Sequence, residues 1–306
     1  MNKNLKDCNW KKRGGFIYSV AFLFLFISQG WCADKDLPAG QTITPANVSV
    51  LMYHKISNNP TETPDHTLTH LARFEEQMKY LKDNGYTTVD LYDLKAYMER
   101  RISLPEKSVV LTFDDGWKSV QNAVPILKKY KFKATFFIVL EYIDGSYPAF
   151  LTWPELAEIA SHQDFDFGCH SSTHPWIPGN HLISWLAGKT PNRSRKDVVA
   201  EIAGAKKVME EKLQRPVVHY SWPSGWYNDE LLAIARDSGY ITTVTTDQGL
   251  NMPGMSPMKI RRYPVYGQFS VEQFGQLLTR NLTDVSPMAG SAPAGNAVIN
   301  HYPTRK

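Results

Sequence analysis

The stretch Ser108–Trp117 is an uninterrupted apolar run that ends on two adjacent carboxylates and a glycine. It predicts a strand buried on both faces, as in a parallel sheet, so Asp114 and Asp115 fall where the strand leaves the sheet. In α/β proteins this edge carries the chemistry. Neighbouring side chains at a strand end point in different directions, so one carboxylate can bind a metal while the other serves as a base. The alternative is an acidic turn that caps a buried strand, and the pair alone favours it.

A second short apolar strand, within Asp166–His174, also ends on potential ligands. His170 and His174 have the spacing of a helix face, but a glycine before them and a proline after them favour a strand followed by a tight loop. Two imidazoles and Asp115 would form a two-His, one-carboxylate metal site with open positions for water and substrate. Zinc is the metal expected from these ligand types, and nickel, cobalt or iron would fit the same set. The two strand ends together are much more specific than either alone.

Thr112–Gly116 and His170–His174 resemble the first two motifs of the NodB-homology polysaccharide deacetylases, the metal-dependent family that removes acetyl groups from N-acetylglucosamine polymers. The chain is most similar to the branch that contains the poly-N-acetylglucosamine deacetylases of biofilm formation. That branch carries a Leu-Met-Tyr-His-like strand ahead of the Asp-Asp motif, here Val50–His54. The resemblance covers about residues 48 to 268. It implies an α/β fold, a distorted (β/α)7-type barrel that is circularly permuted.

The resemblance also implies an activity, the hydrolytic removal of acetate from an acetylated amino-sugar polymer. It assigns one divalent ion to Asp115, His170 and His174, and the role of general base to Asp114. The metal would polarise the acetyl carbonyl and acidify its water. The family's third motif supplies a backbone N–H that faces the oxyanion, and Ser224 occupies that position here.

The third motif departs from the family pattern of Arg, a variable residue, Pro, Tyr and Gly. Ser221 stands where the family has the Arg that helps to orient the catalytic carboxylate, and Ser224 stands where it has Tyr. Arg262, on a strand predicted over Ile260–Val265, could supply the missing charge, and a solvent-facing Arg is an equal alternative. The fourth motif has no clear match. A second hypothesis is therefore a metal- and glycan-binding module without turnover, and a third is a metal-dependent hydrolase of small amides.

Two histidines compete for the role of general acid. The family's usual motif order places this residue late in the chain, and Ala297–His301 resembles that pattern. In the closer relatives the corresponding strand stands at the front, where it delivers His54. We favour His54 because its strand leads directly into the barrel, whereas His301 follows a small-residue segment near the terminus, where chain ends fray. A buried structural histidine is the alternative for His54.

Four tryptophans follow the presumed catalytic strand ends. Taken singly, each is expected to pack beneath the loops, but we predict that one of the four stacks on a sugar ring of the substrate. The four residues are Trp117, Trp176, Trp222 and Trp226.

Residues 1–33 have the layout of a secretory signal peptide: a cationic start, a short apolar run and small or polar residues up to Ala33. They carry the whole formal net charge of +4, so the rest of the chain is near neutral and offers no basic surface for nucleic acid. We expect an exported protein, in the periplasm, at the cell surface or outside the cell. An uncleaved leader would associate it with a membrane. Cys169 is the one cysteine clearly beyond the leader, so we expect a core residue and no disulfide.

Strands and helices alternate from Val48 onward, and about seven βα units without an internal break predict one barrel. Residues 175–196 lack strong periodicity and predict a functional loop. A strong amphipathic helix is predicted over Asp197–Leu213. The sequence predicts no oligomeric state. The predicted organisation is a leader at 1–33, a linker at 34–47, a deacetylase domain at 48–282 and a small-residue-rich tail at 283–306.

Overall fold

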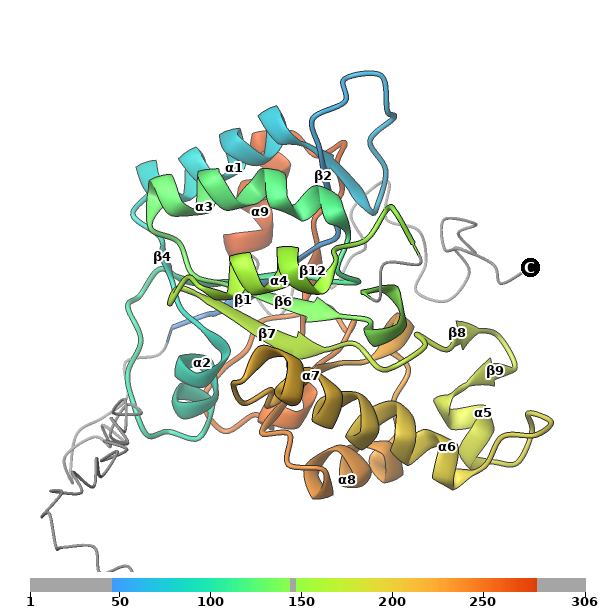
Figure 1. Ribbon diagram of the computed structural model, residues 1–306. Coiled ribbons are helices and arrows are strands. Elements are labelled where there is room, and N and C mark those ends of the chain that lie inside the picture. Colours follow the sequence, from blue (N-terminus) through green and yellow to red (C-terminus); the bar gives the residue numbers. More distant parts are fainter. Residues whose placement is uncertain (1–45, 144–146, 280–306) are drawn as a thin grey trace, which may run out of the picture. The chain divides into compact units, whose positions relative to one another are not determined.

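The computed structural model describes residues 46–143 and 147–279 (Figure 1). The chain divides into two units, residues 1–35 and 36–306, and all described residues belong to the second. Within the described ranges, no helix combines the length and the apolar character that a membrane span requires. The predicted leader, the tail and His301 lie outside the described residues.

A curled sheet of eight parallel strands forms the centre of the fold. Its order is β11-β10-β7-β6-β5-β1-β12, and β4 pairs with β5 beside this path. A parallel bridge between Val244 and Ile260 links β11 to the segment that leads into β12, so the two edges of the sheet are joined. The strands are β1 Ser49–Tyr53, β4 Thr87–Thr88, β5 Ser108–Phe113, β6 Ala134–Ile138, β7 Phe165–Cys169, β10 His219–Ser221, β11 Thr242–Val244 and β12 Tyr263–Pro264.

The front strand β1 occupies a barrel position, as predicted from the sequence. It lies between β5 and β12, and Tyr53 at its end pairs with Phe113 at the end of β5. Both strands are buried along their whole length, which is why they read as continuous apolar runs. Residues that directly follow Tyr53 and Phe113 therefore emerge side by side at one edge of the sheet.

A row of aromatic rings crosses the sheet just beneath this edge. The ring of Phe113 stacks on Tyr53 at a centroid distance of 5.3 Å and on Phe136 at 5.0 Å. Phe136 in turn stacks on Phe167 of β7 at 5.7 Å. Stacked rings of this kind add to the stabilisation that their burial provides. They hold four adjacent strands in register, and so fix the level from which the functional side chains project.

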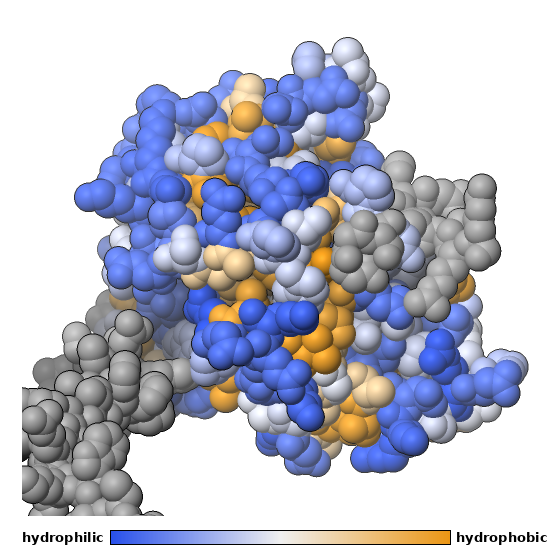
Figure 2. Space-filling model, viewed as in Figure 1, coloured by the Kyte–Doolittle hydropathy of each residue, from blue (hydrophilic) through white to orange (hydrophobic). Residues whose placement is uncertain are grey.

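Helices cover the outside of the sheet. The helix α1 packs against both α3 and α9, and α7 and α8 lie on a different side of the sheet (Figure 1). Figure 2 shows a mainly polar face, with apolar side chains gathered towards its centre, where Figure 1 shows the sheet. The helices are α1 Leu71–Asp83, α2 Leu91–Met98, α3 Ala123–Tyr130, α4 Trp153–Ala160, α5 Leu182–Leu186, α6 Arg195–Val199, α7 Ala205–Leu213, α8 Asp229–Asp237 and α9 Val271–Thr279.

The segment 175–196, predicted as a loop, contains regular structure. Strands β8 (Trp176–Ile177) and β9 (Asn180–His181) form a short antiparallel hairpin, and α5 follows directly. These elements have two to five residues each, which is too short for a periodic pattern. The helix predicted over Asp197–Leu213 begins two residues earlier than expected and includes a π-helical segment, Ala200–Gly204, between α6 and α7. The remaining small sheet pairs β2 (Lys55–Ser57) with β3 (Leu68–His70).

Candidate active site

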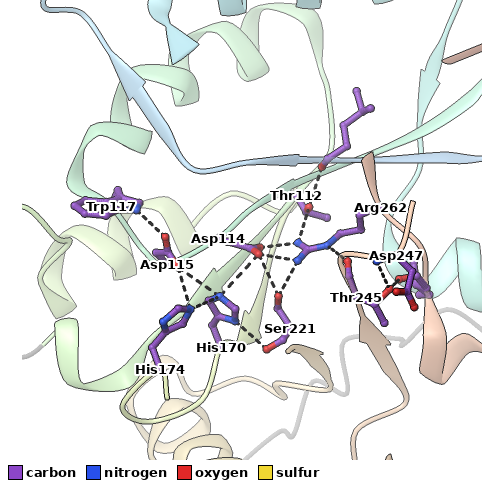
Figure 3. Close-up of polar contacts among 12 residues, drawn as sticks. Thr112, Asp114, Asp115, Trp117, His170, His174, Ser221, Thr245, Asp247 and Arg262 are labelled. Carbon is purple, nitrogen blue, oxygen red and sulfur yellow. Dashed lines mark hydrogen bonds and ion pairs between the residues drawn. The ribbon is translucent and has the colours of Figure 1, made fainter. Parts of the chain in front are cut away.

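Asp115, His170 and His174 converge at the edge of the sheet where β5 and β7 end (Figure 3). The Oδ1 atom of Asp115 lies 3.4 Å from Nε2 of His170 and 3.7 Å from Nε2 of His174. The two Nε2 atoms lie 3.1 Å apart. All three side chains are buried. The sequence prediction placed these residues together, and the structure has them together.

The donor set fits a divalent metal ion. The carbonyl of Ser221 lies 2.8 Å from Nδ1 of His170, so this ring donates from Nδ1 and presents the Nε2 lone pair to the cluster. Burial, together with the neighbouring His170, lowers the pKa of His174 to about 3, so this ring is neutral. Burial raises the pKa of Asp115, but the three surrounding histidines outweigh it and hold the pKa well below its usual range. A carboxylate and two imidazole nitrogens are ligands that zinc and similar ions accept.

Arg262 binds the carboxylate of Asp114 through two parallel hydrogen bonds. Nη1 donates to Oδ1 and Nη2 to Oδ2, both at 2.7 Å. The remaining guanidinium donors bind Thr112 Oγ1 at 3.2 Å, Ser221 Oγ at 3.0 Å and the Thr245 carbonyl at 2.9 Å. Arg262 is 0% exposed, so the alternative of a solvent-facing Arg is wrong. The charge missing from the third motif comes from the segment before β12.

Ser221 allows Arg262 to take the place of the Arg that the family carries in its third motif. It ends β10 at the position of the family's Arg, and its hydroxyl donates to Asp114 Oδ2 at 3.2 Å. A serine leaves room for the guanidinium of Arg262 against the same carboxylate. Burial raises the pKa of Asp114, but Arg262 and then His170 outweigh it, so the pKa lies below its ordinary value. Asp114 is therefore an ionised carboxylate, and its Oδ2 atom lies 3.9 Å from Nε2 of His170.

Two of the four candidate substrate tryptophans are buried, so packing holds for both, and the assignment of these two to substrate binding is corrected. Trp222 is 0% exposed, and its indole donates to Thr243 Oγ1 at 2.9 Å. Trp117 is 6% exposed, stacks on Phe150 at 4.2 Å and has the Lys55 ammonium 4.0 Å from its ring centroid. Neither ring has a free face for a sugar. Trp117 instead supports the metal site, because its indole donates to Asp115 Oδ2 at 2.8 Å.

The other two tryptophans are partly exposed. Trp176 lies on β8, and Trp226 follows the 3-10 turn Pro223–Gly225. The ring of Trp226 packs against His181 of β9 at a centroid distance of 4.3 Å. The hairpin and the turn of the third motif are thus in contact, and each carries a partly exposed tryptophan.

Ser224 lies at the centre of that 3-10 turn, with an exposed side chain and a φ of 54°. Left-handed backbone at a residue with a side chain is uncommon and often marks a functional turn. The next residue must be glycine, because a Cβ at Gly225 would meet Thr246 Oγ1 at 1.9 Å. The turn comes shortly after Ser221 in the chain, and the hydroxyl of Ser221 contacts Asp114.

His54 directly follows β1 and is half-buried. Its imidazole interacts electrostatically with Asp114, Asp115 and His174, so it lies near all three. The prediction that β1 delivers His54 to the same edge as the metal ligands agrees with this arrangement. The competing residue, His301, lies outside the described residues.

One residue that bears on the site was missed from the sequence. Glu201 is 4% exposed and binds the loop between His170 and His174. The sequence indicated this residue, because Glu201 is a carboxylate among the buried apolar positions of the helix predicted over Asp197–Leu213.

Cys169 is a free, fully buried thiol, and burial raises its pKa to about 12. The prediction of a core residue is confirmed.

A family model for polysaccharide deacetylases matches residues 101–243. The Bacillus subtilis protein YxkH, named as a polysaccharide deacetylase, is 32% identical over 237 residues, which cover 77% of this chain and 77% of that protein. The chain belongs to the polysaccharide deacetylase family. This membership confirms the resemblance on which the sequence prediction was based.

Further relatives agree with the predicted branch and fold. The poly-β-1,6-N-acetyl-D-glucosamine N-deacetylase of Staphylococcus aureus is 23% identical over 223 residues, covering 68% of this chain and 74% of that protein. The solved Streptococcus pyogenes deacetylase PplD in complex with acetate is 26% identical, with a TM-score of 0.66, over 78% of this chain and all of that one. IcaB from Ammonifex degensii shares the fold, with a TM-score of 0.64 and 23% identity over 78% of this chain and 98% of that one. The NodB-type (β/α) barrel is confirmed.

Proposed function

We propose that this family member removes acetate hydrolytically from an N-acetylglucosamine-containing polysaccharide and that it requires one divalent metal ion. The observation that carries the proposal is the donor set of Asp115, His170 and His174 beside the ionised, Arg262-paired carboxylate of Asp114. The kinship to a poly-β-1,6-N-acetyl-D-glucosamine N-deacetylase supports the substrate class. Zinc is the expected metal by ligand type.

An ion bound by these three residues would polarise the acetyl carbonyl and acidify a nearby water. Asp114 accepts the proton of the attacking water, and Arg262 keeps its carboxylate ionised and oriented. The backbone N–H of Ser224 donates to the oxyanion that forms on the acetyl group. His54 donates a proton to the leaving nitrogen. The products are acetate and a free amine, so a neutral polymer becomes a polycation.

Substrate contacts outside this centre are assigned to Trp176 and Trp226. Both are partly exposed, and they lie on two segments that contact each other through His181. Partly exposed aromatic rings suit the apolar face of a pyranose. We also propose export, on the basis of the leader at 1–33, to the periplasm, the cell surface or the medium.

The competing hypothesis of a binding module was motivated by the missing Arg of the third motif. Arg262 supports an enzyme instead, since it gives Asp114 the counter-ion that a base needs in order to stay ionised when buried. A hydrolase of small amides would use the same centre, and only substrates of different length distinguish it from a polysaccharide deacetylase.

Acetate release from acetylated glucosamine oligomers tests the proposal. We expect release by the purified chain, loss of release after treatment with a chelator, and recovery when zinc is restored. The rate per acetyl group is expected to rise with oligomer length. Binding of the oligomer without any release would favour the binding module, and equal rates on a small acetamide would favour the third hypothesis.

A pair of variants tests the assignment of the general acid. We expect His54→Ala to lose most deacetylation while retaining metal, because the leaving nitrogen then lacks a positioned proton donor; such donors contribute about 100- to 10,000-fold to a rate. A chain truncated after Asp284 is expected to retain activity. Loss of activity on truncation, together with a fully active His54→Ala variant, would assign the role to His301.

A further inference from the structure

The loop from His170 to His174 has a backbone that residues with side chains seldom adopt. Ser171 has a φ of 67° and His174 a φ of 53°, both in the left-handed region. The backbone N–H of Leu140 donates to the Ser171 carbonyl at 3.1 Å and holds part of the loop. The separation of the two imidazoles depends on this conformation. Contacts that maintain the loop therefore bear on metal binding.

The side chain of Glu201 makes three hydrogen bonds to this loop. Its Oε2 atom accepts from the backbone N–H of Ser172 at 3.0 Å and from that of Thr173 at 2.8 Å. Its Oε1 atom accepts from the Thr173 hydroxyl at 2.9 Å. Hydrogen bonds to an ionised acceptor are stronger than those between neutral groups. Both residues that Glu201 binds lie between the two metal-binding imidazoles.

Glu201 reaches the loop from the π-helical segment Ala200–Gly204. π-helical turns are rare and occur frequently at functional sites. Its neighbours on the buried face, Val198 and Ile202, are fully buried apolar residues. Burying a carboxylate in such surroundings costs free energy of folding unless its oxygens accept hydrogen bonds. All three donors named above come from the loop. The helix thus places a buried acceptor where the loop offers N–H groups.

We propose that Glu201 is a positioning residue for the metal centre, which fixes the relative placement of His170 and His174 by holding the two residues between them. The inference rests on the metal centre of the proposed function. Glu201 acts through the loop, in the way that outer partners orient metal ligands. Loss of such a partner lowers metal affinity by about 10- to 100-fold.

The variant Glu201→Met tests this role, because it keeps about the size of the side chain and removes both oxygens that accept from the loop. We expect its zinc affinity, measured by competition with a chelator, to fall by about 10- to 100-fold. The visible spectrum of the Co²⁺-loaded chain is expected to change, while circular dichroism shows a folded metal-free protein. The control Ile202→Val removes a methylene from the same segment. It is expected to lower the melting temperature and leave zinc affinity and the cobalt spectrum unchanged.

Unchanged zinc affinity and an unchanged cobalt spectrum in Glu201→Met would overturn the inference, as would an equal loss of affinity in Ile202→Val. If Glu201→Met does not fold, Thr173→Val removes the hydroxyl contact alone. A severalfold loss of zinc affinity then supports the positioning role, and an unchanged affinity refutes it. These measurements need no substrate. A wild-type chain that binds no zinc would contradict the proposed function itself, and with it this inference.

Discussion

The variant His170→Ala is expected to bind no stoichiometric metal and to release no acetate from acetylated glucosamine oligomers. His170 supplies the Nε2 atom that lies within 3.4 Å of Asp115 and 3.1 Å of His174, so its loss leaves two donors of three. Two donors cannot hold an ion as tightly as three, and the role of the metal in polarising the carbonyl is lost with it. Metal analysis of the purified variant and an acetate assay measure both effects.

A matched control is His162→Ala, which removes an imidazole that packs on Phe165 at the other end of β7. We expect this control to retain metal and activity. Full metal occupancy in His170→Ala would contradict the assignment of the ligands. Metal loss in both variants would show that the site is sensitive to any change along β7.

The variant Asp114→Asn is expected to retain metal while its rate falls by two or more orders of magnitude, because an amide cannot accept the proton of the attacking water. The structure adds a second consequence. The amide also leaves the buried guanidinium of Arg262 without its counter-ion, and breaking a buried ion pair costs about 3–5 kcal/mol in the free energy of unfolding. Metal analysis, single-turnover kinetics and denaturant unfolding measure the three quantities.

The double variant Asp114→Asn with Arg262→Met separates these two effects. Removing the unpaired charge is expected to restore stability, since apolar replacements of a whole buried pair are often neutral or stabilising. Activity is expected to remain low, because the base is still absent. Near-normal activity in either variant would show that Asp114 is only structural.

The strands that carry the chemistry were predictable from the sequence because they are buried on both faces. Val109, Val110 and Leu111 have almost no exposed surface, so a continuous apolar run marks the strand and its end marks the sheet edge. The convergence of Asp115 with the two imidazoles follows from the parallel order of β5, β6 and β7, which brings their carboxyl ends to one edge. The metal donor set was therefore within reach of sequence reasoning.

What the sequence could not give is the fate of single side chains beyond the strand ends. Trp117 and Trp222 each follow a strand end, and this position in the sequence does not show whether a tryptophan is buried or exposed. Only the three-dimensional packing shows that both are buried. Arg262 posed the same difficulty, because an Arg on the strand predicted over Ile260–Val265 can face solvent or the core equally well. Its hydrogen bonds to Asp114 depend on a sheet closure between segments almost 150 residues apart in the chain.

Because β1 pairs with β12, a complete active centre needs more of the chain than the residues that match the family model. The residues that match the family model, 101–243, contain Asp114 and all three metal donors. They begin after His54 and stop before Arg262. A fragment cut to the matched residues would keep the donors and lose both the proposed acid and the counter-ion of the base. The smallest piece with a complete centre therefore runs from β1 to beyond β12, with its flanking strands as much a part of the chemistry as its motifs.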